Sequence, residues 1–302
     1  RDRNVSPEQT RHFQQAVKKS PSGRWFLWSG KEMGCKRLAL ALGVVLAVTA
    51  FAREYEVRLL RGTERSGVWG TGEFEVAVNE YGAVRMVKVG GAEYFSQAAV
   101  LYTSPVPPGA ANGIRAVQGE GVGARGLGPE KPTMRTSQAG GGRVFEFETV
   151  IARPEILDGA PVCRVNQKVA VLSTGEIRVG YDLEWLQTVR WDHVMLLLLL
   201  DQKQCHGREY MALAGDSVYA GVMEPGPATE RRLRGVPLDQ LTLRLDKGPC
   251  PIVLDEPSVC EFSWGGGVQL SIRPTEAARK GFIYAGQKAR FSFRILLPVS
   301  QQ

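Results

Sequence analysis

The chain of 302 residues is poor in the side chains on which common catalytic and metal-binding designs depend. It has three histidines, five cysteines, no C-x-x-C pair and no G-x-S-x-G nucleophile elbow. A zinc site needs Cys or His ligands at short spacing, and a Ser- or Cys-based triad needs a histidine base. The sequence therefore predicts no metal site and disfavours triad hydrolases. Carboxylate pairs for glycosidic bond cleavage have no local signature, so that class stays open.

Basic side chains are also scarce beyond the first part of the chain. The net charge is +7, from 38 Lys and Arg against 31 Asp and Glu. Residues 1–52 hold nine of the basic and three of the acidic side chains, which leaves 29 and 28 in residues 53–302. A protein that binds phosphate backbones needs a concentrated basic face. Nucleic acid is therefore excluded as a partner.

The longest apolar run in the first part of the chain is short for a membrane span. Leu38–Ala50 has 13 residues, which as a helix reach only about 20 Å of the roughly 30 Å hydrocarbon core. The basic segment Met33–Arg37 precedes it, and Ala50-Phe51-Ala52 follows as a small-x-small cleavage site. We expect residues 33–52 to be a cleaved Sec-type signal peptide, with an uncleaved anchor as the alternative. The mature protein is then periplasmic or extracellular, with no stable membrane span.

The start of the chain does not suit a signal peptide, because the chain opens with Arg1 and the basic segment begins only at Met33. We expect Met33 to be the true start, residues 1–32 to be a disordered upstream extension, and residues 53–302 to form a single domain.

Four cysteines remain after cleavage: Cys163, Cys205, Cys250 and Cys260. In an oxidising compartment they permit two disulfides with three possible connectivities. Buried free thiols are equally compatible with the sequence.

The pattern after residue 52 is that of short strands separated by turns. Glu73–Val78 alternates strictly, Asn79–Gly82 is a turn signal, and Ala83–Val89 returns before Gly90-Gly91. Further strands are predicted at Glu93–Phe95, Gly113–Gln118, Arg143–Ile151, Val162–Leu172, Ile177–Glu184, Ser217–Met223, Leu241–Leu245, Pro251–Leu254, Val259–Ser263, Val268–Ile272 and Ala289–Leu297.

The run His193–Leu200 is apolar without alternation. Its eight residues suit a central strand that is buried on both faces. A short buried helix is the rival, because leucine favours helices. We favour the strand.

Twelve to fifteen short strands without crossover helices predict an all-β fold, an antiparallel two-sheet sandwich. Gly121–Gly126 fits the letters G-x-G-x-x-G, but it lies in a Gly- and Pro-rich stretch with no helix former after it. A dinucleotide site needs a strand before that motif and a helix after it. No cofactor is therefore predicted.

The densest cluster of candidate ligand-binding residues runs from Asp182 to His193. Aromatic rings flanked by polar groups can hold sugars, but packing of the tryptophans into the core and a surface Arg–Asp pair explain the cluster more simply. A second polar cluster at residues 205–210 can line a pocket or form a solvated loop. The candidates are Trp185, Arg190, Trp191, Asp192, His193, His206, Arg208 and Glu209.

The meander Phe74–Phe95, the leucine run and the closing Arg290–Pro298, with its F-S-F-x-x-x-L-P pattern, together resemble the galactose mutarotase-like supersandwich. The resemblance implies the fold of aldose 1-epimerases and of β domains in polysaccharide lyases and glycosidases. Epimerases of this kind use a His acid and a Glu base. His193 and His206 are the only candidates for that acid, and neither stands in an epimerase motif.

Three functions follow as hypotheses. The first is an exported β-sandwich that binds carbohydrate or takes part in polysaccharide processing. The second is a sugar epimerase or lyase with a His acid/base. The third is a structural or protein-interaction domain of the cell envelope. The sequence leaves open whether the chain is an enzyme.

Overall fold

The computed structural model describes residues 56–119, 126–224, 233, 235–264, 268–274 and 281–299, with the side chain of residue 264 left out. The expected extension (1–32), the expected signal peptide (33–52) and residues 121–125 of the glycine motif lie outside this set. In the part that the structure describes, no helix is long and apolar enough to cross a membrane.

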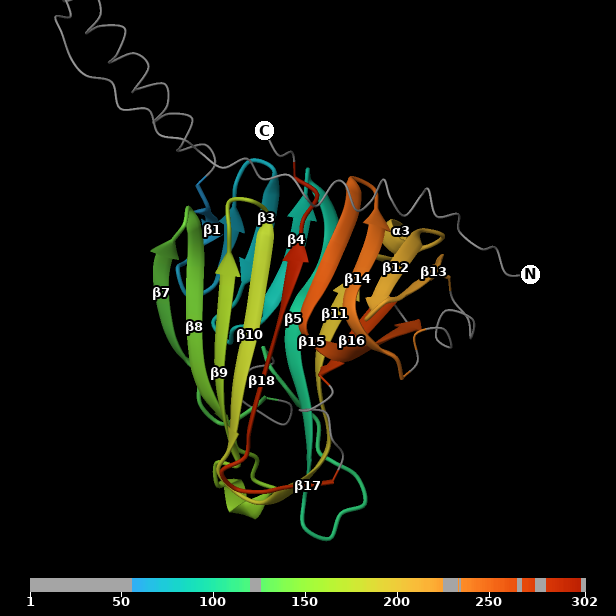
Figure 1. Cartoon of the computed structure of the whole chain (residues 1–302). Helices are drawn as coiled ribbons and strands as arrows, with labels where there is room; N and C mark the ends of the chain where they lie inside the picture. The colour runs from blue at the N-terminus through green and yellow to red at the C-terminus, as the bar shows by residue number, and fades with distance from the viewer. Residues whose placement is uncertain are drawn as a thin grey trace, which may run out of the picture. The chain divides into compact units, whose positions relative to one another are not determined.

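The fold is all-β and antiparallel (Figure 1). The described residues form eighteen strands, one 3-10 turn, η1 (Leu157–Gly159), and one short helix, α3 (Gln202–Cys205). The strands are β1 (Arg58–Gly62), β2 (Gly67–Gly70), β3 (Phe74–Val78), β4 (Val84–Val89), β5 (Ala92–Val106), β6 (Ala116–Val117), β7 (Thr133–Ala139), β8 (Gly142–Ile151), β9 (Cys163–Val171), β10 (Glu176–Trp185), β11 (Val189–Leu200), β12 (Glu209–Ala214), β13 (Ser217–Val222), β14 (Pro237–Leu245), β15 (Gly248–Trp264), β16 (Val268–Pro274), β17 (Gly281–Ile283) and β18 (Lys288–Leu296).

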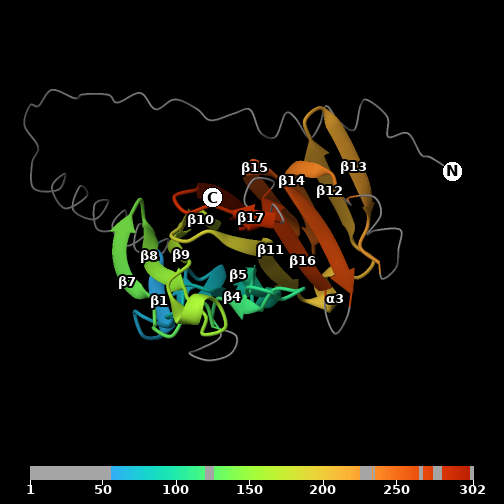
Figure 2. The same cartoon turned by 90° about the horizontal axis from the view of Figure 1, so that it is seen from below.

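All strands belong to one strongly curled sheet that forms two layers. One layer runs β7-β8-β9-β10-β18-β15-β14-β12-β13 and the other runs β1-β2-β3-β4-β5-β11-β16. Strand β15 joins them, because its first half pairs with β14 and β18 and its second half with β16. The view from below shows the sheet curling between the layers (Figure 2). The expected all-β antiparallel fold is confirmed, but in place of the expected two-sheet sandwich the hydrogen bonding is continuous through one curled sheet.

Strand β15 explains the correction. The sequence pattern predicts two strands, Pro251–Leu254 and Val259–Ser263, but the structure has a single strand of 17 residues. Its partner register jumps from Leu238 opposite Ser258 to Gln240 opposite Val253, so the residues between them form a bulge. A bulge bends a strand and accommodates a proline such as Pro257. Because the strand is long and bends at the bulge, its first half pairs in one layer and its second half pairs in the other.

The core lies between the layers and follows the two-residue period of the strands. On β10 the side chains of Ile177, Val179, Tyr181, Leu183 and Trp185 are buried, and the residues between them face outward.

The leucine run is a strand, β11, with β5 on one side and β16 and β17 on the other. The strand interpretation of this run is therefore confirmed over the helix.

Candidate functional site

A groove of about 400 Å³ lies on the outer face of β7, β8, β9, β10 and β18. This volume is within the range of small-molecule sites, about 300–1,000 Å³. Outward-facing polar side chains from all five strands line it, and they are Thr133, Arg135, Glu146, Glu148, Asn166, Lys168, Asp182, Arg290 and Ser292.

The hollow exists because Gly180 has no side chain at the middle of β10. Gly180 pairs with Lys168 on β9 and with Ser292 on β18, so the three residues form one row across the sheet. A Cβ atom at position 180 would lie 3.5 Å from the Ser292 Cβ, which is ordinary contact. An outward position in a strand therefore stays empty, and the small Ser292 side chain lies beside it.

Ion pairs hold the charged side chains around this hollow. Lys168 Nζ lies 3.2 Å from Glu146 Oε1, and Arg290 pairs with Asp182 across β10 and β18. One row further along the strands, Arg164 lies 2.7 Å from Glu184 and 4.0 Å from Glu148. Such pairs are worth little for stability when exposed, but they restrict the orientation of the groups that a ligand meets.

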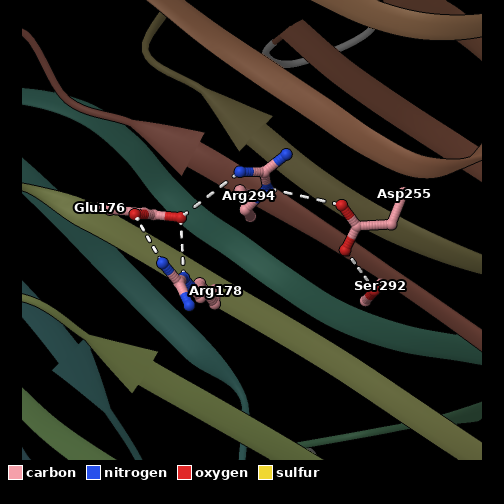
Figure 3. Close-up of polar contacts among 5 residues, drawn as sticks. All are labelled: Glu176, Arg178, Asp255, Ser292 and Arg294. Atoms are coloured by element: carbon pink, nitrogen blue, oxygen red, sulfur yellow. Dashed lines mark hydrogen bonds and ion pairs between the residues drawn. The ribbon is translucent and has the colours of Figure 1, made fainter. Parts of the chain in front are cut away.

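A second network leads from Ser292 toward the start of β10 (Figure 3). Ser292 Oγ donates to Asp255 Oδ2, and Asp255 Oδ1 lies 3.4 Å from Arg294 Nε. Arg294 Nη1 is 3.9 Å from Glu176, which Arg178 holds with two hydrogen bonds of 2.8 and 3.1 Å. Ser292 lines the groove, and because its hydroxyl donates to Asp255, its oxygen is left to act as an acceptor.

A buried ring of hydrogen bonds supports the groove from below. Gln118 Nε2 donates to Gln167 Oε1 at 2.6 Å, Gln167 Nε2 donates to Tyr181 Oη at 2.9 Å, and Tyr181 Oη donates to Gln118 Oε1 at 2.9 Å. Gln118 and Gln167 also donate to the carbonyls of Tyr81 and Gly82, both at 2.8 Å. The ring thus fastens the 79–82 turn beneath the strands that carry Lys168 and Gly180.

The two tryptophans of the predicted cluster lie in the core. Trp185 is 2% exposed and Trp191 is 1% exposed. Their rings pack edge to face, 6.1 Å between centroids. Neither flat face is open to a ligand, so the packing alternative describes both rings. Asp182, at the beginning of the same cluster, lines the groove.

Arg190, Asp192 and His193 follow on β11, in the opposite layer. Arg190 Nη2 donates to the Ala111 carbonyl at 2.6 Å, and Asp192 Oδ2 accepts from the Gly113 amide at 2.6 Å. The His193 ring stacks on Tyr102 at 5.1 Å between centroids. Arg190 and Asp192 thus fix the 111–113 loop, and none of the three residues lines the groove.

His206, Arg208 and Glu209, between α3 and the start of β12, form a third location. Arg208 pairs with Asp246, and Glu209 accepts from Arg244 at 2.9 Å. His206 follows α3, and its backbone amide donates to the Gln202 carbonyl at 2.9 Å. The eight predicted residues therefore occupy three separate places and do not converge on one concave surface.

All four described cysteines are buried free thiols. Burial raises the pKa of Cys163, Cys205, Cys250 and Cys260 from 9.0 to about 12. A neutral buried thiol is neither a nucleophile nor a metal ligand. Among the described residues, no three His, Cys, Asp or Glu side chains gather as a metal site.

The groove residues that the sequence analysis missed carry one usable signal. Gly180 is an isolated glycine within an alternating strand, a position that often marks close approach of a ligand or another backbone. Charged residues alternate on both sides of it in β10 and across it in β18. The groove combines charged and polar residues from strands that are far apart in sequence, from Arg135 on β7 to Ser292 on β18. Their proximity depends on strand pairing, which no local sequence pattern predicts.

Solved structures with a similar strand arrangement were found, although no protein-family model and no curated protein matches the sequence. A galactose 1-epimerase from Lactobacillus acidophilus has 6% identity and a TM-score of 0.42, over 80% of this chain and 97% of its own. An aldose epimerase homologue from C. elegans has 9% identity and a TM-score of 0.41, over 76% and 98%. A galactose mutarotase-like protein from Clostridium acetobutylicum has 9% identity and a TM-score of 0.42, over 80% and 98%.

The chain resembles galactose mutarotase-like proteins. The resemblance expected from the strand pattern is thus found among solved structures, over about 80% of the chain. At these identities and TM-scores it concerns the arrangement of strands, and the activity has to be argued from the groove itself.

Proposed function

We propose that the chain is an exported carbohydrate-binding protein, or one that takes part in polysaccharide processing, and that the outer groove is its ligand site. The hollow between Gly180 and Ser292 carries the proposal. Around it, carboxylates accept hydrogen bonds, Lys168 and Arg290 donate them, and Asn166 does both. A sugar presents many hydroxyl groups that each donate and accept, and a ring of fixed polar groups of both kinds suits such a ligand.

The direct test is a panel of immobilised glycans and polysaccharides probed with residues 53–302. Retention on at least one of them, with competition by the soluble form of the same glycan, is the expected result. Failure to bind any member of a panel that includes neutral and acidic glycans contradicts the proposal.

Ser292 gives the proposal a specific binding contact. Its oxygen accepts from a ligand hydroxyl while its proton stays on Asp255, so the two residues act on the ligand as one unit. Ser292→Ala and Asp255→Ala should each weaken binding by about threefold to tenfold, the range of one net hydrogen bond. The double variant should lose little more than either single one. Two independent, additive losses would show that Asp255 does not orient Ser292.

A sugar epimerase or lyase that uses a His acid is the second candidate from the sequence. His193 lies on β11 and His206 follows α3, and neither lines the groove. The groove therefore offers no histidine for that mechanism, and carbohydrate binding is the function that its polar lining supports best. His193→Ala and His206→Ala should leave glycan affinity unchanged, and a loss of turnover in either variant would revive the enzyme hypothesis.

The proposal that the protein is exported rests only on residues 33–52, which have the pattern of a signal peptide. Expression from Met33 in a bacterial host should release a product whose intact mass corresponds to an N-terminus near Arg53. A product that keeps residues 33–52 would instead indicate an uncleaved anchor.

A further inference from the structure

The charges on the outer face that carries the groove are almost completely paired. Its outward positions hold seven cations and six carboxylates, on β7, β8, β9, β10, β18 and at Asp255 of β15. Each of the six carboxylates lies within 4.0 Å of at least one cation. The cations in these pairs are Arg164, Lys168, Arg178, Lys288, Arg290 and Arg294.

Arg135 is the seventh cation, and it differs from the others. It lies on the edge strand β7, it is exposed, and it lines the groove. Among the described residues it has neither an ion pair nor a hydrogen bond. Its cross-strand neighbour is Glu146, whose carboxylate is held by Lys168 at 3.2 Å. The groove thus presents one guanidinium whose donors are not engaged.

We infer that the ligand of the groove is an acidic glycan, with a uronate carboxylate bound by Arg135 and hydroxyl groups bound in the hollow at Gly180. This inference rests on the proposed function and names the class of its ligand. A guanidinium matches a carboxylate with two parallel hydrogen bonds, and such charge-assisted bonds are shorter and stronger than neutral ones. Of the three cations that line the groove, Lys168 and Arg290 pair with carboxylates and Arg135 does not, so Arg135 is the cation left to bind an anionic group of a ligand.

The register gives the length of this ligand. Arg135, Glu146, Lys168 and Gly180 lie in one row across four adjacent strands. Strands are about 4.8 Å apart, so the backbones of Arg135 and Gly180 are separated by about 14 Å. A ligand that fills the hollow and reaches the Arg135 guanidinium runs across the strands, past Lys168 and Glu146. An oligosaccharide that contains uronate has the length to do so.

The decisive experiment compares a trimer of galacturonate with its methyl ester, which has the same rings and no carboxylate charge. Isothermal titration with wild-type residues 53–302 should show that the acid binds more tightly than the ester. Arg135→Gln should weaken binding of the acid by about tenfold or more and leave the ester unchanged. The affinity of Arg135→Lys for the acid should lie between those of wild type and Arg135→Gln. Lysine keeps the positive charge but loses the planar guanidinium that makes two parallel hydrogen bonds.

Lys288→Gln is the matched control, since Lys288 is an outward cation of β18 that does not line the groove. It should leave the affinity for the acid as it is. Added KCl should weaken binding of the acid and not of the ester, because the Arg135 contact is exposed to solvent.

The outcomes separate the two proposals. Equal affinity for acid and ester, together with an Arg135→Gln variant that binds the acid as tightly as wild type, overturns the uronate assignment and leaves carbohydrate binding intact. Competition by acetate or inorganic sulfate at the same concentrations as the trimer also overturns it, since Arg135 is then a simple anion contact. If no acidic or neutral oligosaccharide binds, the proposed function fails and this inference fails with it.

Discussion

The two faces of strand β10 show how the chain divides stability from recognition. Inward, Ile177, Val179, Tyr181, Leu183 and Trp185 are at most 2% exposed and pack in the core. Outward, β10 carries Glu176, Arg178, Gly180, Asp182 and Glu184. Around the empty position at Gly180, Asp182 and Glu184 pair with cations on neighbouring strands and Arg178 pairs with Glu176 along β10.

Adjacent residues of β10 therefore have different roles: one packs in the core and the next lies on the outer face with the groove. A substitution on the inner face should change the free energy of unfolding and leave the groove chemistry alone. One on the outer face should do the reverse. Substitutions on each face test whether stability and binding are separate, and any variant that changes both would contradict the separation.

The largest effect is expected on the inner side, at Trp191. Trp191→Ala removes a fully buried ring that packs against Trp185, and it should lower the free energy of unfolding by about 3–5 kcal/mol. Urea denaturation measures the loss, and titration at a temperature where the variant is folded should give wild-type glycan affinity. Trp191→Phe is the milder control. Reduced affinity in a folded Trp191→Phe variant would show that the ring contributes to binding.

The outer face should respond in the opposite way at Gly180. Gly180→Leu places a side chain in the hollow and should weaken glycan binding by about 100-fold or more, which corresponds to about 2.7 kcal/mol. The thermal midpoint should not fall, because the new Cβ meets only ordinary contact at 3.5 Å and a strand interior favours a side chain over glycine.

Ser137→Leu is the control for this variant. Ser137 is an exposed, outward position of β7 beyond the groove lining, so the same added side chain should leave affinity unchanged there. If Gly180→Leu binds glycans as wild type does, the groove is not the ligand site.

The sequence predicts the strands well because alternation is a local property. The two strands from Phe74 to Val89, the β9–β10 hairpin and the last strand all lie near their expected positions, whereas the strand expected at Glu93–Phe95 continues as β5 to Val106. The leucine run was predicted as a strand with a helix as the rival, since a segment buried on both faces has no period that separates the two, and the structure confirms the strand. The continuity of β15 was missed because the bulge at Pro257 resembles a strand end in sequence.

The residues predicted from sequence and the residues of the groove differ for a physical reason. The segment from Trp185 to His193 is dense in interesting side chains, but Trp185 and Trp191 point into the core, whereas Arg190 and Asp192 hold a loop of the other layer. The groove combines residues from 133 to 292 that meet only through strand pairing. A high density of polar and aromatic residues in one segment of the sequence therefore does not mean that their side chains share one face of the sheet.

The third expected effect concerns the buried ring that joins the two regions. Gln167→Leu removes a donor to the Gly82 carbonyl and the acceptor of Gln118 Nε2, so it should destabilise the protein by about 1–3 kcal/mol. Tyr181→Phe should cost less, since Gln118 keeps the Leu101 amide and Gln167 keeps Gly82. Both are measured by urea denaturation. Equal losses in the two variants would show that the ring is not held as described.

The smallest effect at neutral pH concerns the thiols of the core. Burial raises the pKa of the four cysteines from 9.0 to about 12, so the folded chain holds them protonated. Their contribution to stability is complete below about pH 9 and is lost as pH rises through 12, because the unfolded chain loses these protons first.

Native protein at pH 8 should therefore resist a thiol reagent that labels all four cysteines in denaturant. The thermal midpoint should begin to fall only above about pH 9. Cys250→Ala, at a fully buried position, should reduce the steepness of that fall. Rapid labelling of any of the four in the native protein at pH 8 would mean that a thiol reaches the outer surface, and the separation between a sealed interior and an accessible charged face would then no longer hold at that position.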